Sequence, residues 1–170
     1  MESKENLVFL GMMGSGKSSV GSLVSKKLGI NFFDIDKIIE NDQKTTISKI
    51  FETKGESFFR EIENKITLNI LRNEYGVIAL GGGAFLSRDI KKEVLKNHLS
   101  FWLSWESKTL INRINNSKKR PLAFKSSKNE ILQIIKKRSL IYSKALYKID
   151  CDNNTKQEIA KKIISIYEAN

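Results

Sequence analysis

The chain has 170 residues, 40% of them hydrophobic and 29% charged, and a formal net charge of +11. This length predicts one compact, soluble domain and leaves too little chain for two ordinary ones. The single cysteine, Cys151, excludes an internal disulfide and favours a reducing compartment. The short apolar run near the N-terminus is neither a signal peptide nor a membrane span, so we expect a cytoplasmic protein that does not contact a membrane.

The basic charge has two interpretations. It can bind nucleic acid, or it can steer small anions and otherwise form a solvated, lysine-rich surface. Basic residues are spread along the chain, with short clusters at 118–120 and 136–138, and no nucleic-acid-binding motif accompanies them. We expect no nucleic-acid partner, and a nucleotide-dependent nucleic-acid-binding module remains the alternative from a different functional class.

The most informative stretch is residues 11–18, which match the pattern G-x-x-x-x-G-K-[ST] at every fixed position. A buried strand is predicted before it, over residues 7–10, and a helix with an apolar stripe from Val20 to Leu28 after it. Strand, glycine loop and helix are the context that a phosphate-binding P-loop requires. A glycine-rich turn that only joins a strand to a helix is the alternative.

The chemistry of this motif follows from its backbone. Glycines turn successive N–H groups toward one point, where the next helix adds its dipole and unpaired amides. Lys17 is predicted to reach the β- and γ-phosphates as a catalytic residue, and the Ser18 hydroxyl to ligate Mg²⁺. The predicted nucleotide-binding residues of this segment are Gly14, Ser15, Gly16, Lys17, Ser18 and Ser19.

A second strand is predicted over residues 31–36, ending in two carboxylates. Alternation along a strand directs Asp34 and Asp36 to the same side, at the carboxyl end where open α/β sheets bind their ligands. The pair then suggests Mg²⁺ and a substrate hydroxyl. Capping of the following helix explains the two aspartates equally well, so both interpretations stand.

Residues 40–75 hold helical patterns and no obvious strand, which is much longer than a usual connection and indicates a helical insertion. Arg60 lies beside its expected apolar face, with Glu63 three residues further on. The simplest interpretation of Arg60 is an exposed helix residue with an i,i+3 partner. The expected apolar face comprises Phe59, Ile62, Ile66 and Ile70.

A third buried strand, residues 77–80, runs into Gly81, Gly82 and Gly83. Three consecutive glycines are entropically costly to order, and they are expected where the backbone must approach a ligand closely. A plain flexible turn is the alternative.

Two further strands are predicted over residues 99–104 and 147–151, each followed by a helical pattern. This alternation predicts an α/β fold with a mainly parallel sheet. Between them, the polar, basic stretch at about 115–127 is typical of a mobile lid. Arg120 in that lid is a candidate to meet developing phosphoryl charge, and a solvated basic loop is the alternative.

The helix expected from about Asn129 places Arg138 on one face with Ile131, Ile135 and Tyr142. An arginine within an apolar face either extends its charged end to water or meets an anion. The pattern of this helix does not distinguish between these two interpretations of Arg138. The lone histidine, His98, precedes a strand in an expected loop and is given no role.

In this order and spacing, the motifs resemble those of the shikimate kinase family over nearly the whole chain. Besides the P-loop, residues 34–40 are similar to the family's D-x-D-x-x-I-E stretch, and residues 55–63 to its G-E-x-x-F-R-x-x-E stretch. The remaining matches are Gly81-Gly82-Gly83, Arg120-Pro121-Leu122 preceded by Arg113, and Arg138 with Tyr142.

The resemblance implies a three-layer P-loop kinase fold in a single domain. It would have a five-stranded parallel sheet with helices on both faces, a small helical substrate-binding subdomain at about 36–75 and a closing lid. The implied reaction transfers the γ-phosphoryl group of ATP to the 3-hydroxyl of shikimate, with Mg²⁺, in aromatic amino-acid (chorismate) biosynthesis. We expect a monomer that binds shikimate and ATP.

The resemblance also implies substrate-binding roles. Asp36 would hold the attacking hydroxyl, and Arg60 and Arg138 would bind the shikimate carboxylate. Gly81, Gly82 and Gly83 would lie against the substrate. The residue types agree with this assignment, because a small carboxylated polyol needs a bidentate arginine and a hydroxyl acceptor.

At the nucleotide, the resemblance implies that Asp34 holds Mg²⁺ through water and Ser18 directly. Arg120 would act catalytically from the lid and reach the phosphates. Arg113 would lie near the adenine, and Asn154 would line the base.

The chain departs from the family in three places, namely Ala123 in the lid, the lack of a proline before Tyr142, and Asn153-Asn154 after the last strand. These departures put the closed packing of the lid and the adenine contacts in doubt. A P-loop does not specify its acceptor, so a related small-molecule kinase, such as a gluconate kinase, is the alternative within the same class.

Overall fold

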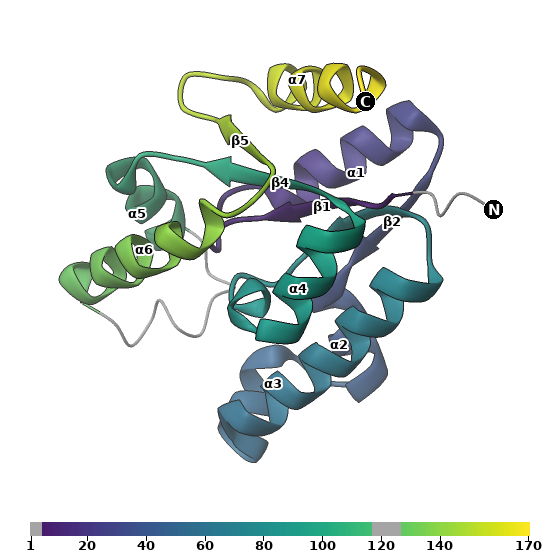
Figure 1. Ribbon diagram of the computed structural model, residues 1–170. Coiled ribbons are helices and arrows are strands. Elements are labelled where there is room, and N and C mark those ends of the chain that lie inside the picture. The colour runs from purple at the N-terminus through teal and green to yellow at the C-terminus, as the bar shows by residue number, and fades with distance from the viewer. Residues whose placement is uncertain (1–4, 117–126) are drawn as a thin grey trace.

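A computed structural model describes residues 5–116 and 127–170 (Figure 1). Five strands form one parallel sheet in the order β2-β3-β1-β4-β5. The strands are β1 (Leu7–Leu10), β2 (Asn31–Asp34), β3 (Gly76–Ala79), β4 (Leu99–Ser104) and β5 (Tyr147–Asp150). The predicted α/β fold with a five-stranded parallel sheet is therefore confirmed. β2 ends at Asp34, two residues earlier than predicted.

Helices cover both faces of this sheet and make three layers. In Figure 1, α1 (Lys17–Leu28) and α7 (Lys156–Glu168) lie above the sheet, and the other helices lie below it or beside its left end. These are α2 (Ile35–Gln43), α3 (Ile47–Asn73), the 3₁₀ turn η1 (Ala84–Leu86), α4 (Arg88–Asn97), α5 (Ser107–Asn115) and α6 (Lys128–Tyr142). No helix in the described ranges is long and apolar enough to cross a membrane.

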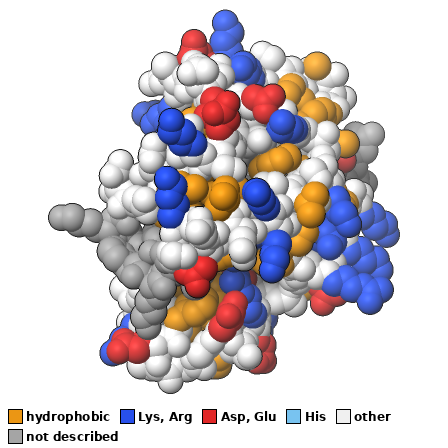
Figure 2. All heavy atoms as spheres, turned by 90° about the vertical axis from the view of Figure 1, so that its left-hand side faces the viewer, with side chains coloured by type: hydrophobic (Ala, Val, Ile, Leu, Met, Phe, Trp, Pro, Cys, Tyr) orange, Lys and Arg blue, Asp and Glu red, His pale blue; other side chains and the backbone are white. Residues whose placement is uncertain are grey.

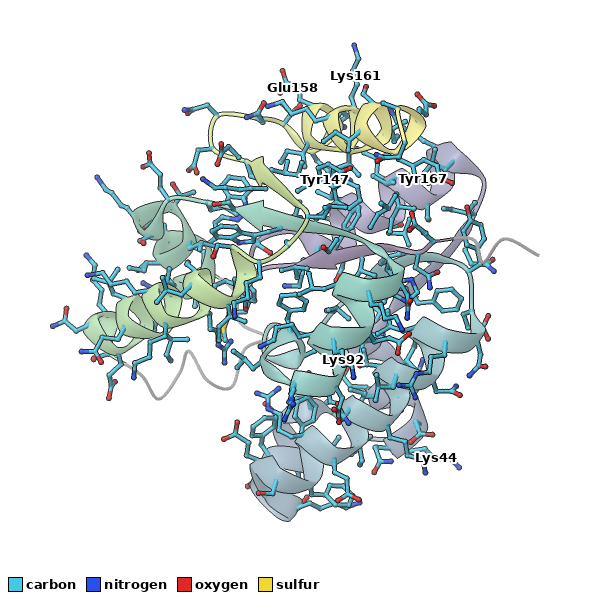
Figure 3. All side chains as sticks on the ribbon, viewed as in Figure 1. Lys44, Lys92, Tyr147, Glu158, Lys161 and Tyr167 are labelled. Carbon is cyan, nitrogen blue, oxygen red and sulfur yellow. The ribbon has the colours of Figure 1, made fainter. Side chains whose placement is uncertain are left out.

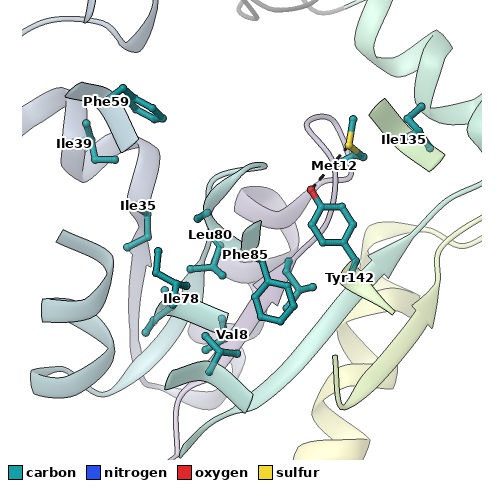
Figure 4. Close-up of a cluster of buried hydrophobic side chains, with 14 of the residues drawn as sticks. Val8, Met12, Ile35, Ile39, Phe59, Ile78, Leu80, Phe85, Ile135 and Tyr142 are labelled. Carbon is teal, nitrogen blue, oxygen red and sulfur yellow. Dashed lines mark hydrogen bonds between the residues drawn. The ribbon is translucent and has the colours of Figure 1, made fainter. Parts of the chain in front are cut away.

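The central strand β1 shows how the sequence produces two cores. All four of its residues are buried, because a central strand of a parallel sheet is covered on both faces. Leu7 and Phe9 belong to the core under α1 and α7, whereas Val8 and Leu10 belong to the core shared with α2 to α6. Figure 4 shows Val8 in this second core. The period of two along a strand thus divides one apolar run between two layers.

The predicted helical insertion at 40–75 is present as α2 and α3, and α3 is kinked at Gly55, where φ is +84°. Its predicted apolar face is shifted. The isoleucines at 62, 66 and 70 are half-buried at the edge of the core. The buried residues beyond the kink are Phe59, Glu63, Thr67 and Leu71. Glu63, expected from the sequence only as the i,i+3 partner of Arg60, is thus one of the buried residues.

Candidate active site

A cavity of about 910 Å³ lies at the carboxyl end of the sheet. Its wall is built by the loop after β1, the start of α2, the middle of α3, the loop after β3, and residues of α5 and α6. The predicted site residues on this wall are Gly14, Gly16, Lys17, Ser18, Ser19, Asp34, Asp36, Arg60, Gly82, Gly83, Arg113 and Arg138. Segments that are far apart in sequence therefore meet in one site, as ligand sites of open parallel sheets do.

The P-loop has the backbone geometry that an anion nest requires. Gly11, Gly14 and Gly16 adopt φ values of +144°, +81° and +92°, which side chains other than glycine rarely tolerate. A Cβ atom at Gly11 would also come within 2.9 Å of the Leu103 carbonyl oxygen. Gly16 stands at the N-cap of α1 and has no side chain to cap it. The first amides of α1 are thus left for an anionic ligand.

Lys17 lies across this loop and is 9% exposed. Its Nζ donates to the carbonyl oxygens of Gly11, at 2.8 Å, and Met12, at 2.9 Å. Its charge also opposes the rise in the pKa of Asp36. The ammonium is thus held between the phosphate-binding backbone and a carboxylate, which is a suitable place to stabilise transferring phosphoryl charge.

The two aspartates reach the cavity by different routes, and the alternation argument made from the sequence is wrong. Asp34 ends β2 and caps α2, with its Oδ1 accepting a hydrogen bond from the Lys37 amide at 3.3 Å. Asp36 lies in the first turn of α2 and not on the strand. A helical turn, rather than the period of two, brings Asp36 to the wall. The capping interpretation is correct for Asp34, and capping through one oxygen leaves the other for a ligand.

Asp36 is exposed to the open cavity, and on its inner side its Oδ1 lies against Gly81. The surrounding protein raises its pKa, mainly by desolvation. Lys17 and Arg60 oppose the rise, and Asp34 and Glu40 add to it. A carboxylate with a raised pKa accepts a proton more readily than an ordinary aspartate, which suits a group that receives a hydroxyl hydrogen bond.

Arg60 is paired with a carboxylate that sequence reasoning left out of the site. Arg60 Nη1 donates to Glu63 Oε2 at 2.6 Å, and the exposed Glu56 approaches Arg60 Nε at 3.4 Å. The Glu63 side chain is 3% exposed and that of Arg60 29%. Burial raises the pKa of Glu63, and Arg60 opposes this. The sequence offered one indication of this, because Glu63 lies four residues after Phe59 and therefore on the same face of α3.

Two residues of the triple glycine, Gly81 and Gly83, lie close to the ends of charged side chains. A Cβ at Gly81 would lie 2.6 Å from Glu63 Oε1 and 2.8 Å from Asp36 Oδ1, and one at Gly83 would lie 2.6 Å from Arg60 Nη2. The plain-turn interpretation of the sequence remains the alternative to a ligand-binding turn. The backbone here packs directly on the charged groups of the site, with Gly82 and Gly83 on its wall.

Arg138 and Tyr142 hold this backbone from the other side. Arg138 Nη1 donates to the Gly82 carbonyl oxygen at 3.3 Å, and the Tyr142 hydroxyl donates to the same oxygen. Tyr142 is 1% exposed, and burial raises its pKa to about 12, so it remains a donor. In Figure 4 its ring lies beneath the loop that carries Met12. The guanidinium of Arg138 therefore extends into the site and not only to outer solvent.

Comparison with known proteins agrees with this geometry. The family model for shikimate kinase matches residues 13–168. The chain belongs to the shikimate kinase family. It is 39% identical over 165 residues to the shikimate kinase of Thermodesulfovibrio yellowstonii, covering 96% of this chain and 95% of the relative. It is 38% identical over 159 residues to that of Bartonella henselae, covering 93% and 76%.

The fold of a solved shikimate kinase is also closely similar. The structure of the enzyme from Acinetobacter baumannii in complex with shikimate has a TM-score of 0.91 and 29% identity, covering 99% of this chain and 96% of that one. The predicted family is thus confirmed. The roles predicted for individual residues remain predictions, with the positions described above.

Among the described residues, three that were predicted for this shikimate kinase-family site are not on the cavity wall. Ser15 and Gly81 lie directly beside wall residues. Asn154 binds the Asp152 carbonyl oxygen and Lys162 Nζ, both at 2.8 Å, and lines a second, more open hollow of about 640 Å³ beside β5 and α7. Arg120 and most of the predicted lid lie outside the described residues.

Proposed function

We propose that this protein transfers the γ-phosphoryl group of ATP to the 3-hydroxyl of shikimate, giving shikimate 3-phosphate and ADP in chorismate biosynthesis. One observation carries the proposal. The same cavity has a phosphate-binding backbone and Lys17 at one end, and Arg60, Arg138 and Asp36 at the other. Phosphoryl transfer asks a protein mainly to position its reactants and to stabilise charge, and these groups can do both.

The substrate would lie between α2, α3 and the triple glycine. Arg60 and Arg138 supply planar, charged donors for its carboxylate. Asp36 would accept the hydrogen bond of the attacking hydroxyl and orient it toward the phosphate, and Gly81 to Gly83 would allow the ring to approach the backbone. α2 and α3 then serve as the substrate-binding subdomain.

ATP would bind with its phosphates on residues 14–19. Mg²⁺, when bound, neutralises phosphate charge. Ser18 and Asp34 fit it, because both line the cavity and offer the oxygen ligands that this ion prefers. Arg113 would contact the adenine side. As the family resemblance implies, Arg120 in the predicted lid would reach the phosphates, and Asn154 would line the adenine base.

We further propose a monomeric cytoplasmic enzyme without a nucleic-acid partner. On the face shown in Figure 2, Lys and Arg side chains are interspersed with Asp, Glu and hydrophobic side chains. Figure 3 shows Lys161 and Glu158 projecting outward from α7, and Lys92 on α4 is exposed. This distribution supports a solvated surface over a nucleic-acid groove.

A coupled assay tests the function. Purified protein with ATP and Mg²⁺ should release ADP when shikimate is added, and much less with gluconate or other hydroxy acids at equal concentration. Preferential turnover of another acceptor would reassign the substrate. Folded, ATP-binding protein with no turnover of shikimate would overturn the proposal.

A further inference from the structure

Trp105 connects two parts of the nucleotide end of the cavity. It follows β4 directly, is half-buried, and packs against both hydrophobic cores. Its indole Nε1–H donates to the Ser15 carbonyl oxygen at 2.9 Å. The guanidinium carbon of Arg113 lies 4.3 Å from the centre of its ring, and Arg113 Nε donates to the Gly14 carbonyl oxygen at 2.7 Å.

These interactions fix two consecutive peptide planes of the P-loop. In a trans peptide, the carbonyl and the N–H of the next residue point in opposite directions. The hydrogen bond from Trp105 to the Ser15 carbonyl therefore directs the Gly16 N–H away from the indole. The bond from Arg113 to the Gly14 carbonyl likewise directs the Ser15 N–H away from the guanidinium. The Ser15 N–H accordingly donates back across the loop to the Met12 carbonyl oxygen at 3.1 Å. Gly16 itself lines the cavity.

The same ring holds Arg113 in place. Arg113 is exposed, and a long exposed side chain samples many rotamers unless something restrains it. Stacking on the indole and the bond to Gly14 keep its guanidinium beside the loop, with Nη2 only 3.6 Å from where a Cβ atom of Gly16 would lie. An aliphatic residue at 105 could fill the space, but it would offer neither the N–H nor the aromatic face.

The backbone around Trp105 is anchored on both sides. The Ser104 carbonyl oxygen accepts from the Cys151 amide at 2.9 Å. The Glu106 amide donates to Asp152 Oδ2 at 2.7 Å, and the Thr109 hydroxyl donates to Asp152 Oδ1 at 2.9 Å. Asp152 thus fixes the first turn of α5 from the β5–α7 loop, and the indole has a rigid base from which to hold Arg113.

We propose that Trp105 is a positioning residue for the adenine nucleotide, holding Arg113 and the peptide planes at Gly14 and Ser15 as one preformed wall. The inference rests on the proposed function only in taking the nucleotide to be an adenine nucleotide. It makes no use of the acceptor, so it can be tested with shikimate absent.

Two substitutions separate the hydrogen bond of the indole from its stacking on Arg113. Trp105→Phe keeps an aromatic face for Arg113 and removes the N–H, and Trp105→Leu removes both. By calorimetry with ADP and Mg²⁺, we expect the Kd of ADP to rise about 3- to 10-fold in Trp105→Phe and about 10- to 50-fold in Trp105→Leu. The larger rise in Trp105→Leu is expected because this change abolishes the stacking as well as the hydrogen bond. The Kd of shikimate, titrated separately, should stay within about twofold.

The other tryptophan provides a matched control. Trp102 lies on β4, three residues earlier, and contacts Tyr142 and Lys148 instead of the P-loop. Trp102→Phe should leave the Kd of ADP within about twofold. In the coupled assay, the Trp105 variants should raise the KM for ATP more than they lower kcat.

Thermodynamic coupling supplies the last test. The double variant, Trp105→Leu with Arg113→Ala, should raise the Kd of ADP by a smaller factor than the product of the factors measured for the two single variants. This is expected because the ring acts partly through Arg113. An ADP affinity within twofold of the parent in both Trp105 variants overturns the inference. So does an equal loss for ADP and shikimate. If the parent protein does not phosphorylate shikimate but its Trp105 variants selectively lose ADP binding, this inference holds and the proposed function fails.

Discussion

The two ends of the cavity are built by different means. The nucleotide end is built mainly on one short segment, residues 11–19, whose backbone provides most of the binding groups, with Arg113 beside it. The substrate end comes from charged side chains on α2, α3 and α6 that meet over the triple glycine. A backbone site depends on local conformation, whereas a side-chain site depends on how distant elements pack. Substitutions at the two ends should therefore impair binding and catalysis in different ways.

The charged side chains at the substrate end balance one another. At the substrate end, Asp36 and Glu63 face Arg60 and Arg138, so acids and bases are matched before a ligand binds. Arg60 has five N–H donors, of which one makes the short bond to Glu63 and two make longer bonds of 3.4 Å to the exposed Glu56. The remaining two can serve an anionic ligand. The buried glutamate thus holds the arginine in place without exhausting it.

The largest expected effect is on chemistry at the substrate end, where Asp36 interacts with the charge of Lys17. Asp36→Asn removes the carboxylate and should lower kcat by about 10²- to 10⁴-fold. The Kd of ADP should change little, because ADP contacts the backbone end. Asp42→Asn, an exposed change on the same helix, is the control. An equal loss in ADP affinity would mean that the two ends are not separable.

The next effect tests the carboxylate site. Arg138→Ala should weaken shikimate binding by about 2–4 kcal/mol, as expected for the loss of a charge-assisted contact. ADP binding should be affected far less, as measured by calorimetry with each ligand alone. Lys137→Ala changes an exposed neighbour and should alter neither. Equal losses for both ligands would reject the role given to Arg138.

A smaller effect separates the two glutamates that contact Arg60. Glu63→Gln disrupts a pair whose acid is 3% exposed and should lower the free energy of unfolding by roughly 1–3 kcal/mol while raising the Kd of shikimate. Glu56→Gln removes a contact whose acid is 66% exposed and should cost under about 1 kcal/mol. Denaturant unfolding of both variants makes the comparison, and similar losses would contradict the packing described.

The smallest effect is expected far from the cavity, at the amino end of β4. His98 Nδ1 accepts from the Asn6 amide at 3.4 Å, and Nε2 is buried without a partner among residues 5–116 and 127–170. Burial lowers the pKa of His98, although Glu93 and Glu5 oppose this. The unfolded chain therefore takes up a proton that the folded chain resists, and stability falls as pH drops below about 6.5.

His98→Gln tests this pH dependence. Between pH 7.5 and pH 5, the parent should lose more unfolding free energy than the variant does, as measured by denaturant titration at each pH. The KM values for ATP and shikimate at pH 7.5 should be the same in both proteins. A parallel loss in the two proteins would show that His98 does not cause it.

Much of this site could be predicted from the sequence because its signals are local. Residues 11–18 combine glycines, Lys17 and Ser18 in a spacing that only a phosphate-binding loop explains well. The five apolar runs predicted the five strands, and Gly81 to Gly83 signalled close backbone approach. Arg138 was singled out because an arginine within an apolar face needs a reason to be there.

Other features depended on contacts that the sequence does not record. Asp36 was placed on a strand, and a break at Asp34 instead puts it on a helix, where its distance to the P-loop is decided by tertiary packing. Glu63 was missed because its burial depends on Arg60 and on the loop after β3. Trp105 was missed because its partners at Ser15 and Arg113 adjoin it only in space.

The sequence by itself determined where the glycine-rich anion nest forms, because such a nest is made by consecutive residues whose φ and ψ angles depend on local composition. Only the tertiary structure decided which carboxylates are enclosed, which arginines share a wall, and what holds the nucleotide loop in place. Those properties depend on solvent exclusion and on distances between atoms far apart along the chain, and both are set only when the helices pack on the sheet.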